Sequence, residues 1–267
     1  MKTKTRIGPV YFFGSDASDI ASVLAGRKIA LFLDFDGTLT PIQENPTQCH
    51  LSEEVRELLQ SLANSDRHHV TVLSGRTLDD VKSRVGVPNI CYGGNHGLVI
   101  SGKGLQFVHP SALQAKPLIE EAGRRLEKHM APFERAWVEK KDFTLSLHYR
   151  LVNQGRVRQL KMAFYKIAAE ISRGSLLKVM KGKKVLELMP AIPWNKGNAV
   201  LWILDRLGNH SYTPIFVGDD VTDETAFEAL ENLGITIRMG RSKKTLVRFY
   251  LQNYQGTLRL LKTIQRA

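Results

Sequence analysis

The chain has 267 residues, of which 43% are hydrophobic and 24% charged, as in an ordinary globular protein. This length suits one large domain or two smaller ones. No apolar run reaches the ~18 residues that a membrane helix requires, and no apolar signal core follows the basic start MKTKTRIG. Cys49 and Cys91 form neither a disulfide framework nor a metal-binding spacing. We therefore expect a cytoplasmic protein.

The chain is strongly basic, with a net charge of +12 and a pI of about 9.7. Residues 106–192 hold 17 Lys or Arg and 8 Asp or Glu, so this segment alone carries +9. Such a charge is typical of proteins that bind nucleic acid or smaller anions. The chain has no recognisable nucleic-acid motif, and the basic segment mixes its cations with acids and His148. These features favour an anionic small molecule with hydroxyl groups, and nucleic-acid binding stays open as an alternative.

The first elements predict a strand between two helices. A helix near residues 17–24 precedes the apolar strand 29–33, which runs directly into Asp34 and Asp36. An amphipathic helix follows, with Ser52 as its N-cap. Its apolar residues at helical spacing are Val55, Leu58, Leu59 and Leu62.

The next segments repeat this alternation. HHVTVLSGR (68–76) is read as a strand, residues 78–84 as a helix, and NICYGGNHG (89–97) as a third strand. Strands that alternate with helices predict a doubly wound parallel sheet of the α/β class. Ligands bind at the carboxyl ends of the strands in such sheets, which is where Asp34 and Asp36 would lie.

The pattern changes after about residue 106. A helix is predicted from the apolar stripe Leu118, Ala122, Leu126 and Met130. From Phe143 the sequence alternates strictly, which predicts a half-buried antiparallel strand. One face would carry Phe143, Leu145, Leu147 and Tyr149, and the other Thr144, Ser146, His148 and Arg150.

A second helix and a second alternating strand complete this segment. The helix is indicated by Val157, Leu160, Phe164, Ile167 and Ile171. In KKVLELMP (183–190), Leu186 and Leu188 would lie on one face and Lys183, Val185 and Glu187 on the other. We therefore predict an α/β unit over residues 107–192, inserted into a core formed by residues 1–106 and 193–267.

After this inserted unit, the alternation of helices and apolar strands that predicts the core resumes. An apolar-periodic helix starts near Lys196, followed by the strand TPIFVGDD (213–220) and a helix from about residue 224. GITIRMG (234–240) is a further strand, and a helical segment ends the chain.

Four short segments carry the candidate chemistry: D-F-D-G-T (34–38), Ser74, Lys196 and GDDVTDE (218–224). The carboxylates of the last segment repel one another unless a cation neutralises them. Carboxylate oxygens suit Mg²⁺, and a carboxylate can also attack phosphorus to form an acyl phosphate. A metal ion and a lysine would then offset the charge of the phosphoryl group, while a second carboxylate transfers a proton.

The order of these motifs resembles that of the haloacid dehalogenase superfamily. The resemblance implies that Asp34 is the nucleophile and a metal ligand, and that Asp36 is the general acid and base and binds the metal through its backbone carbonyl. It further implies that Ser74 and Lys196 hold the phosphoryl group. Asp219 would bind Mg²⁺ directly, and Asp220 and Asp223 would support the site.

Further motifs are similar to those of the trehalose-6-phosphate phosphatase family, whose members insert an α/β cap into this core. Its sugar-contacting motifs read roughly V-E-x-K, S-x-x-x-H-Y-R and G-x-K-V-x-E, and they map here to the segments 138–141, 144–150 and 182–187. The substrate-binding residues that this resemblance implies are Gly75, Arg76, Asn95, His96, Gly97, Glu139, Lys141, His148, Arg150, Lys183 and Glu187. The chain departs from the family at Leu98 to Ile100, where an acid is common, and at Asn195, where an aspartate is frequent.

The resemblance implies a Mg²⁺-dependent phosphatase that hydrolyses trehalose 6-phosphate through an aspartyl phosphate on Asp34. A related substrate such as glucosylglycerol phosphate, a phosphosugar mutase, and a non-catalytic anion-binding or regulatory protein on the same fold are the alternatives. No membrane partner is expected. The sequence leaves the oligomeric state open, with a monomer favoured.

Overall fold

The computed structural model describes residues 8–14, 24–43, 49–172, 176–182, 184–208 and 211–267. The chain divides into two compact units: unit 1 comprises Met1–Phe107 and Trp194–Ala267, and unit 2 is the inserted segment Val108–Pro193. Most of the helix predicted at residues 17–24 lies outside the described residues. No helix of the described part is long and apolar enough to cross a lipid bilayer.

Unit 1 is built on one nine-stranded sheet. From β1 to β4 in the spatial order, neighbouring strands run parallel, whereas β5 is antiparallel to β4. This confirms the predicted parallel α/β sheet. In spatial order the strands are β1 (Val10–Tyr11), β13 (Phe249–Leu251), β12 (Ile235–Met239), β11 (Thr213–Gly218), β2 (Ile29–Asp34), β3 (His68–Leu73), β4 (Cys91–Gly94), β5 (Val99–Gly102) and β6 (Leu105–Val108).

The strand order reverses at β2. The chain continues from β2 to β3 and β4 on one side, and later adds β11, β12 and β13 on the other. Such a reversal opens a crevice at the carboxyl ends of the two strands beside it. Here those strands are β2 and β11, which end at Asp34 and Gly218.

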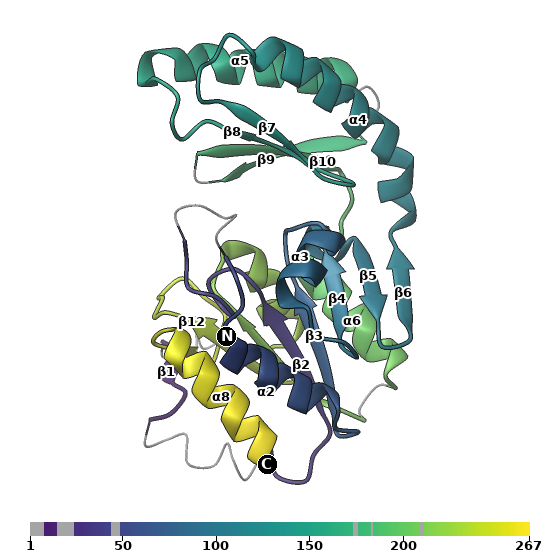
Figure 1. Ribbon diagram of the computed structural model, residues 1–267, viewed down its shortest axis with the longest axis vertical. Helices are drawn as coiled ribbons and strands as arrows, with labels where there is room; N and C mark the ends of the chain where they lie inside the picture. The colour runs from purple at the N-terminus through teal and green to yellow at the C-terminus, as the bar shows by residue number, and fades with distance from the viewer. Residues whose placement is uncertain (1–7, 15–23, 44–48, 173–175, 183, 209–210) are drawn as a thin grey trace, which may run out of the picture. The chain divides into compact units, whose positions relative to one another are not determined.

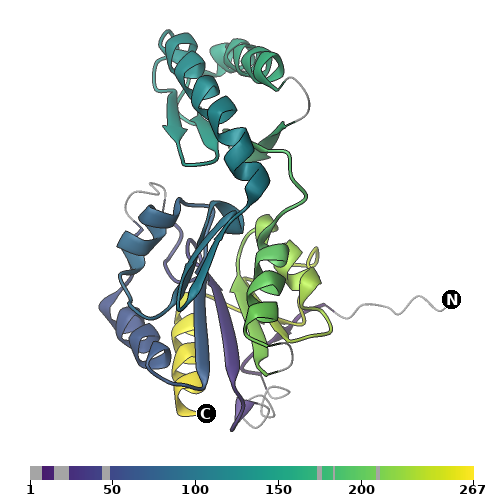
Figure 2. The same ribbon diagram turned by 90° about the vertical axis from the view of Figure 1, so that its right-hand side faces the viewer.

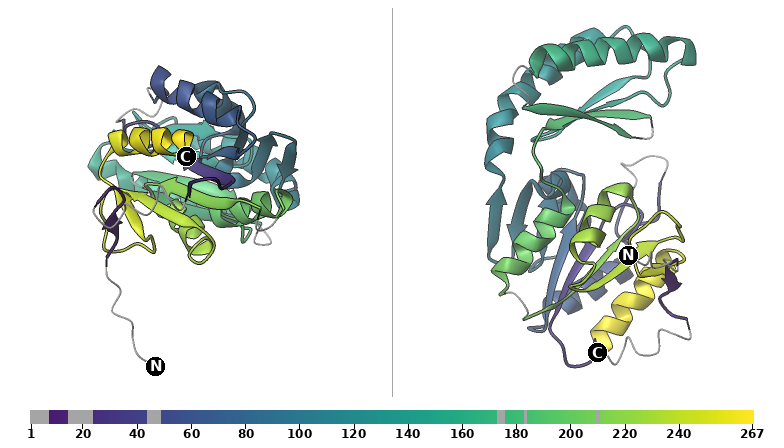
Figure 3. Two further views of the ribbon diagram at one scale, coloured as in Figure 1. Left: turned by 90° about the horizontal axis from the view of Figure 1, so that it is seen from below. Right: turned by 180° about the vertical axis from the view of Figure 1, so that it is seen from behind.

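Helices cover both faces of this sheet, so β2 is buried along its whole length. Alternate residues of β2 pack into two separate cores: Leu31 and Leu33 into the first, and Phe32 into the second. Figures 1 and 2 show the blue and yellow helices on one face and the green ones on the other, and the left view of Figure 3 shows this end-on. The first face carries α2 (Glu53–Ala63), α3 (Leu78–Val85) and α8 (Tyr254–Arg266), and the second α6 (Lys196–Arg206) and α7 (Glu224–Ala229).

Polar side chains set where these helices begin. The Ser52 hydroxyl accepts a hydrogen bond from the Val55 backbone at 3.4 Å, which confirms the predicted cap of α2. Thr77 caps α3 in the same way, and Gly86 ends that helix in the left-handed conformation, with φ of 61°. The cap at Thr77 fixes the start of α3 three residues after Ser74.

Unit 2 contains a four-stranded antiparallel sheet with two helices on one face (Figure 1; Figure 3, right). Leu145, Leu147, Leu186 and Leu188 pack against the helices, as their alternation predicts. The strands in spatial order are β7 (Trp137–Lys140), β8 (Leu145–His148), β10 (Val185–Pro190) and β9 (Leu177–Gly182), and the helices are α4 (Pro110–Met130) and α5 (Gln154–Ile171).

The second face of this sheet is more buried than the predicted half-buried strand implies. Ser146 is 3% exposed and Glu187 is 8% exposed. Ser146 lies directly across from Glu139 on one neighbouring strand and from Glu187 on the other. The longer side chains flank the serine and shield it, so β8 is buried on both faces.

Candidate active site

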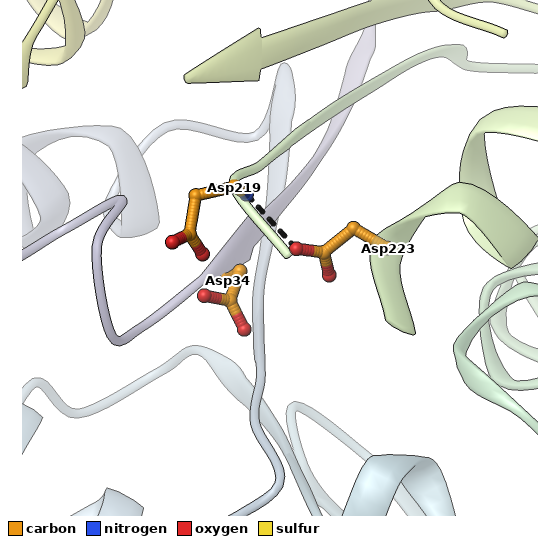
Figure 4. Close-up of side chains that lie close together, drawn as sticks. All are labelled: Asp34, Asp219 and Asp223. Atoms are coloured by element: carbon orange, nitrogen blue, oxygen red, sulfur yellow. Dashed lines mark hydrogen bonds between the residues drawn. The ribbon is translucent and has the colours of Figure 1, made fainter. Parts of the chain in front are cut away.

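Three aspartates meet at the crevice between β2 and β11. Asp34 is the last residue of β2, and Asp219 and Asp223 follow β11. One carboxylate oxygen of each lies within 4.8 Å of the other two, and Figure 4 shows the three side chains together. We call this group the aspartate cluster. Their closeness is the geometry of a site for a cation with a preference for oxygen ligands.

Lys196, the first residue of α6, points its ammonium group at two members of the aspartate cluster. Its Nζ lies 2.5 Å from Asp34 Oδ1 and 2.6 Å from Asp223 Oδ1, and only 2% of its side chain is exposed. Burial by itself lowers the pKa of Lys196, but the two carboxylates outweigh burial and raise it. The lysine is therefore a fixed positive charge inside the site.

The aspartate cluster carries more negative charge than this lysine neutralises. Burial raises the pKa of Asp34, and the charges of Asp223 and Asp219 raise it further, while Lys196 opposes them. Burial, together with repulsion from Asp223 and Asp220, raises the pKa of Asp219 to about 6. A bound cation would remove this repulsion, because it supplies the missing positive charge.

The loop after β11 is organised by Asp223. Its Oδ2 accepts the backbone N–H groups of Asp219 and Asp220 at 2.9 and 3.0 Å. A Cβ atom at position 218 would lie 2.4 Å from Asp223 Cγ, so only glycine fits there. Gly37 meets the same loop: its φ is +83°, and a Cβ atom would lie 2.3 Å from Asp219 Oδ2.

The structure separates Asp220 and Asp36 from the aspartate cluster. Asp220 is exposed, and its carboxylate accepts the backbone N–H of Val221 at 2.7 Å, as a cap of the short helix η4 (Val221–Asp223). The carboxylate of Asp36 instead faces the guanidinium of Arg76. The predicted indirect support of the metal by the Asp220 side chain stays a prediction.

Two loops at the ends of β3 and β4 are joined by backbone hydrogen bonds. The His96 N–H donates to the Ser74 carbonyl at 2.9 Å, and the Asn95 N–H donates to the Arg76 carbonyl at 2.7 Å. The buried Ser74 hydroxyl accepts the Arg76 N–H at 3.1 Å. A Cβ atom on Gly75 would lie 2.7 Å from the His96 ring. The sequence-predicted residues from Ser74 to Arg76 and from Asn95 to Gly97 thus form one surface.

Asn95 is fully buried, and its side-chain amide makes no hydrogen bond to any part of the chain that the structure describes. A buried amide without a partner is costly, which indicates that a polar ligand or water completes it. Gly97 follows with φ of +87°, and its carbonyl accepts the Trp194 indole N–H at 2.9 Å. A Cβ atom on Gly97 would lie 2.4 Å from Ala199, so this loop packs directly on α6.

Asn195 departs from the family pattern but has a clear structural role. It is the N-cap of α6, and its side chain accepts the Asn198 backbone N–H at 3.0 Å. Asn198 returns the contact by accepting the Asn195 N–H at 3.1 Å. This reciprocal cap fixes the first turn of α6, and so the position of Lys196.

In unit 2, the predicted residues on β7, β8 and β10 lie on one sheet face. His148 Nε2 lies 2.8 Å from Glu139 Oε2, and Lys141 Nζ lies 3.6 Å from Glu187 Oε1. Arg150 is an exposed turn residue after β8, and Lys183 lies outside the described residues. The face therefore holds both hydrogen-bond donors and acceptors.

Sequence reasoning missed two residues that belong to these surfaces. Trp137 is 47% exposed and stacks on His148, with ring centroids 4.5 Å apart and ring planes 4° apart. The alternation Trp137, Glu139, Lys141 would have placed it on this face. Asp80, the second, lies between two arginines at the helical spacing i, i+4, which was the available signal.

The fold agrees with solved structures of low sequence identity. A protein described as related to trehalose-6-phosphate phosphatase matches with a TM-score of 0.76 and 24% identity, over 89% of this chain and 97% of that one. A haloacid dehalogenase-like hydrolase from Bacteroides thetaiotaomicron matches with a TM-score of 0.61 and 16% identity, over 89% of this chain and all of that one. Both likenesses establish the haloacid dehalogenase-like fold.

Sequence comparison is more specific. The trehalose-phosphatase family model matches residues 32–253. The trehalose-phosphate phosphatase of Mycobacterium tuberculosis is 38% identical over 225 residues, which cover 83% of this chain. These residues span 56% of that relative's length, so the relative contains much that this chain does not. With its motif residues gathered at the crevice of the sheet, the chain belongs to the trehalose-phosphatase family.

Proposed function

We propose that this chain is a phosphatase that hydrolyses trehalose 6-phosphate to trehalose and inorganic phosphate. The observation that carries the proposal is the contact of Asp34 with Lys196 inside the aspartate cluster. A buried carboxylate beside a fixed ammonium group combines a nucleophile with a group that attracts phosphate. Membership of the trehalose-phosphatase family supports the choice of substrate.

The aspartate cluster fits a divalent cation, and Mg²⁺ is the ion that we propose. Its donors are oxygen atoms, and its surplus negative charge calls for a cation. Asp34 and Asp219 would hold the ion directly, with the Asp36 backbone carbonyl. Asp223 would act indirectly, because its two oxygens already accept hydrogen bonds from Lys196 and from the loop backbone. When bound, the ion would offset the charge of the phosphoryl oxygens.

The chain's own residues would carry the reaction in two steps. An oxygen of Asp34 forms a bond to phosphorus while the bond from phosphorus to the sugar oxygen breaks. The sugar oxygen takes the proton of Asp36. Water then attacks the aspartyl phosphate and gives its proton to Asp36, which frees phosphate and restores the Asp34 carboxylate.

Ser74 and Lys196 would hold the phosphoryl group during both steps. The Ser74 hydroxyl is buried at the end of β3, and its O–H remains available as a donor because its oxygen accepts from the Arg76 backbone. Lys196 contributes a permanent charge, since its pKa is raised. Both groups would stabilise negative charge as it shifts in the transition state.

The sugar would be recognised by the mixed donors and acceptors of unit 2. Glu139, Lys141, His148 and Glu187 offer charged hydrogen-bond partners for hydroxyl groups. A related sugar phosphate such as glucosylglycerol phosphate would make some of the same contacts and is the alternative substrate. We retain a cytoplasmic location in this proposal, because Cys49 and Cys91 are free and buried.

Phosphate release from a substrate panel with Mg²⁺ tests the proposal. The panel comprises trehalose 6-phosphate, glucosylglycerol phosphate, sucrose 6-phosphate and glucose 6-phosphate. We expect trehalose 6-phosphate to lead in kcat/KM and Asp34→Asn to be inactive. Asp79→Asn, which changes an exposed aspartate of α3, is the matched control and should retain activity.

Any other result of this assay would show which part of the proposed function is wrong. If another sugar phosphate leads, the assignment of trehalose fails while that of phosphatase stands. If wild type releases no phosphate and binds random DNA in a salt-sensitive way, the nucleic-acid alternative replaces it. If Asp34→Asn is as active as wild type, the nucleophile is misassigned.

A further inference from the structure

Arg76 forms a bidentate contact with the carboxylate of Asp36 through two nitrogen atoms of its guanidinium group. Arg76 Nε donates to Asp36 Oδ2 at 2.8 Å, and Arg76 Nη2 donates to Asp36 Oδ1 at 2.7 Å. The two residues come from the ends of neighbouring strands, two positions after Asp34 and two after Ser74. This bidentate contact fixes the plane of the Asp36 carboxylate as well as its position.

Arg76 is itself held in place from several sides. Its Nη1 donates to Asp80 Oδ2 at 2.8 Å, and its guanidinium lies 5.5 Å from the centre of the Phe35 ring. Only 13% of the Arg76 side chain is exposed. A guanidinium with this many contacts has little freedom to swing toward another ligand.

Asp80 extends the contact into α3. Its second oxygen, Oδ1, accepts Arg84 Nε at 2.8 Å, and Arg84 Nη1 donates to the Cys49 carbonyl at 2.9 Å. The Asp80 backbone N–H is capped by Thr77 at 3.1 Å. Asp36, Arg76, Asp80 and Arg84 thus form a string of alternating charges, which we call the charge string.

We propose that Arg76 is a positioning residue that orients Asp36 for proton transfer, and that Asp80 holds Arg76 for this task. This inference rests on the proposed function and replaces the expectation that Arg76 contacts substrate. Proton transfer depends on the direction of the carboxylate, and a turn residue that is 43% exposed at its side chain would otherwise sample several rotamers. In the first step, protonated Asp36 donates its O–H proton to the leaving sugar oxygen while its oxygens still accept from Arg76. In the second step, a lone pair that Arg76 leaves free on the Asp36 carboxylate accepts the proton of water.

A purely structural role is the competing explanation for the charge string, because a bidentate ion pair within a network of charges can also stabilise the fold. Such a role would affect all substrates alike, whatever their leaving group. A positioning role instead requires the planar guanidinium, whose two parallel N–H donors lysine does not have. The proposal therefore predicts that Arg76→Lys is less active than wild type, although both proteins carry one positive charge at this position.

The test compares leaving groups that need a proton to different degrees. We would measure kcat/KM for trehalose 6-phosphate, phenyl phosphate and 4-nitrophenyl phosphate, because kcat/KM reports on the step in which the leaving oxygen departs. Nitrophenolate leaves readily as an anion, whereas an alkoxide needs the proton of Asp36. Asp36→Asn gives the reference pattern for a lost general acid.

We expect Arg76→Gln to lower kcat/KM for trehalose 6-phosphate by about 100-fold, and for 4-nitrophenyl phosphate by less than about 10-fold. Phenyl phosphate should fall in between. Arg76→Lys should recover only part of the loss, and Asp80→Asn should show the same order of substrates with a smaller effect. Arg56→Gln is the matched control. This arginine donates to the carbonyl of Val85, the last residue of α3, without joining the charge string, so the substrate pattern should match wild type.

A double-mutant cycle separates positioning from substrate contact. If Arg76 acts through Asp36, then Arg76→Gln adds little further loss to Asp36→Asn, since the acid is already gone. Full additivity, or an equal loss with phenyl and 4-nitrophenyl phosphate, would overturn the proposal. If Arg76→Gln does not fold, Arg76→Lys and Asp80→Asn decide it by the same two criteria. An inactive wild type would instead refute the proposed function itself.

Discussion

Lys196 and Asp223 are 2.6 Å apart at Nζ and Oδ1, and both side chains are almost completely buried. Asp223 uses its other oxygen to accept two backbone N–H groups of the loop that carries Asp219. One carboxylate therefore fixes both the ammonium group at the nucleophile and the loop of the second carboxylate.

Replacing Lys196 by methionine should abolish most activity and also weaken the fold. Asp34 and Asp223 would lose their shared cation, and breaking a buried ion pair typically costs about 3–5 kcal/mol. We expect kcat/KM to fall by at least about 100-fold, as after loss of a charge-stabilising donor. Kinetics and urea unfolding measure the two effects. Lys262→Met, at an exposed lysine paired with Glu54, should change neither.

Asp34→Asn should be inactive and yet more stable than wild type in the absence of metal. Burial and two neighbouring carboxylates raise the pKa of Asp34, so its ionised form destabilises the folded state at neutral pH. Asparagine has nearly the same shape as aspartate but no charge, and Lys196 keeps its ion pair with Asp223. A gain of about 1 kcal/mol corresponds to roughly 2–4 °C in Tm for a chain of this size. A lower Tm by calorimetry would contradict this account.

Metal affinity should fall as the pH drops through about 6. At this pH Asp219 takes up a proton, because burial and its acidic neighbours raise its pKa to about 6. The proton competes with the cation, so the apparent Mg²⁺ affinity should decrease up to about 10-fold per pH unit below this value. Titration calorimetry with Mg²⁺ at pH 5 and 7.5 measures the change.

Two variants check the metal assignment. Asp219→Asn should lose most of its affinity at both pH values. Asp220→Asn should bind the ion nearly as wild type does, because Asp220 is exposed and caps η4. If Asp220→Asn loses the ion as completely as Asp219→Asn, the cluster has been assigned wrongly.

His69 should make the fold less stable in mild acid. Burial, with a smaller contribution from Lys103, lowers the pKa of His69 from 6.5 to about 4. Between these two pH values the unfolded chain binds a proton that the folded chain does not, so stability falls as the pH falls. The full shift is worth at most about 3 kcal/mol. His68 adds in the same direction, since burial also lowers its pKa.

Urea unfolding at pH 4.5 and 7 tests this. His69→Asn should lose less stability between these pH values than wild type does. His129→Asn, at an exposed histidine of α4, should keep the wild-type difference. Equal slopes for all three proteins would remove His69 as the cause.

The sequence predicted the parallel sheet and the positions of its main strands along the chain, because motif spacing and apolar runs are local. Asp34, Ser74, Lys196 and Asp219 could be placed at one sheet edge, since parallel strands deliver their carboxyl ends together. The side-chain direction of Asp36 could not be predicted, because it depends on Arg76, which is forty residues away in sequence and follows another strand.

In the sheet of unit 2, too, local patterns were predicted correctly and contacts between distant strands were missed. Leu145 and Leu147 were assigned to the core correctly, since alternation alone decides which face each residue joins. The burial of Ser146 was missed because its two flanking glutamates come from other strands. The edge strand β9 was not predicted, because its sequence LKVMKG has no strict alternation and its structure depends on pairing with β10.

Trp137 and His148 should determine which phosphate ester is accepted rather than how fast phosphate is released. Their rings stack on the face that carries Glu139, so together they offer an apolar surface beside polar groups, which suits a sugar ring. We expect Trp137→Ala and His148→Ala each to lower kcat/KM for trehalose 6-phosphate by about 10-fold to 200-fold. Their kcat/KM for 4-nitrophenyl phosphate should stay within about 2-fold of wild type, because that substrate lacks the sugar and the aspartate cluster is untouched.

Glu127→Gln, which breaks an exposed ion pair with Lys140, is the control in unit 2 and should leave kcat/KM for both substrates unchanged. Parallel losses with both substrates would mean that these residues support the fold of unit 2, and their assignment to sugar recognition would then be wrong.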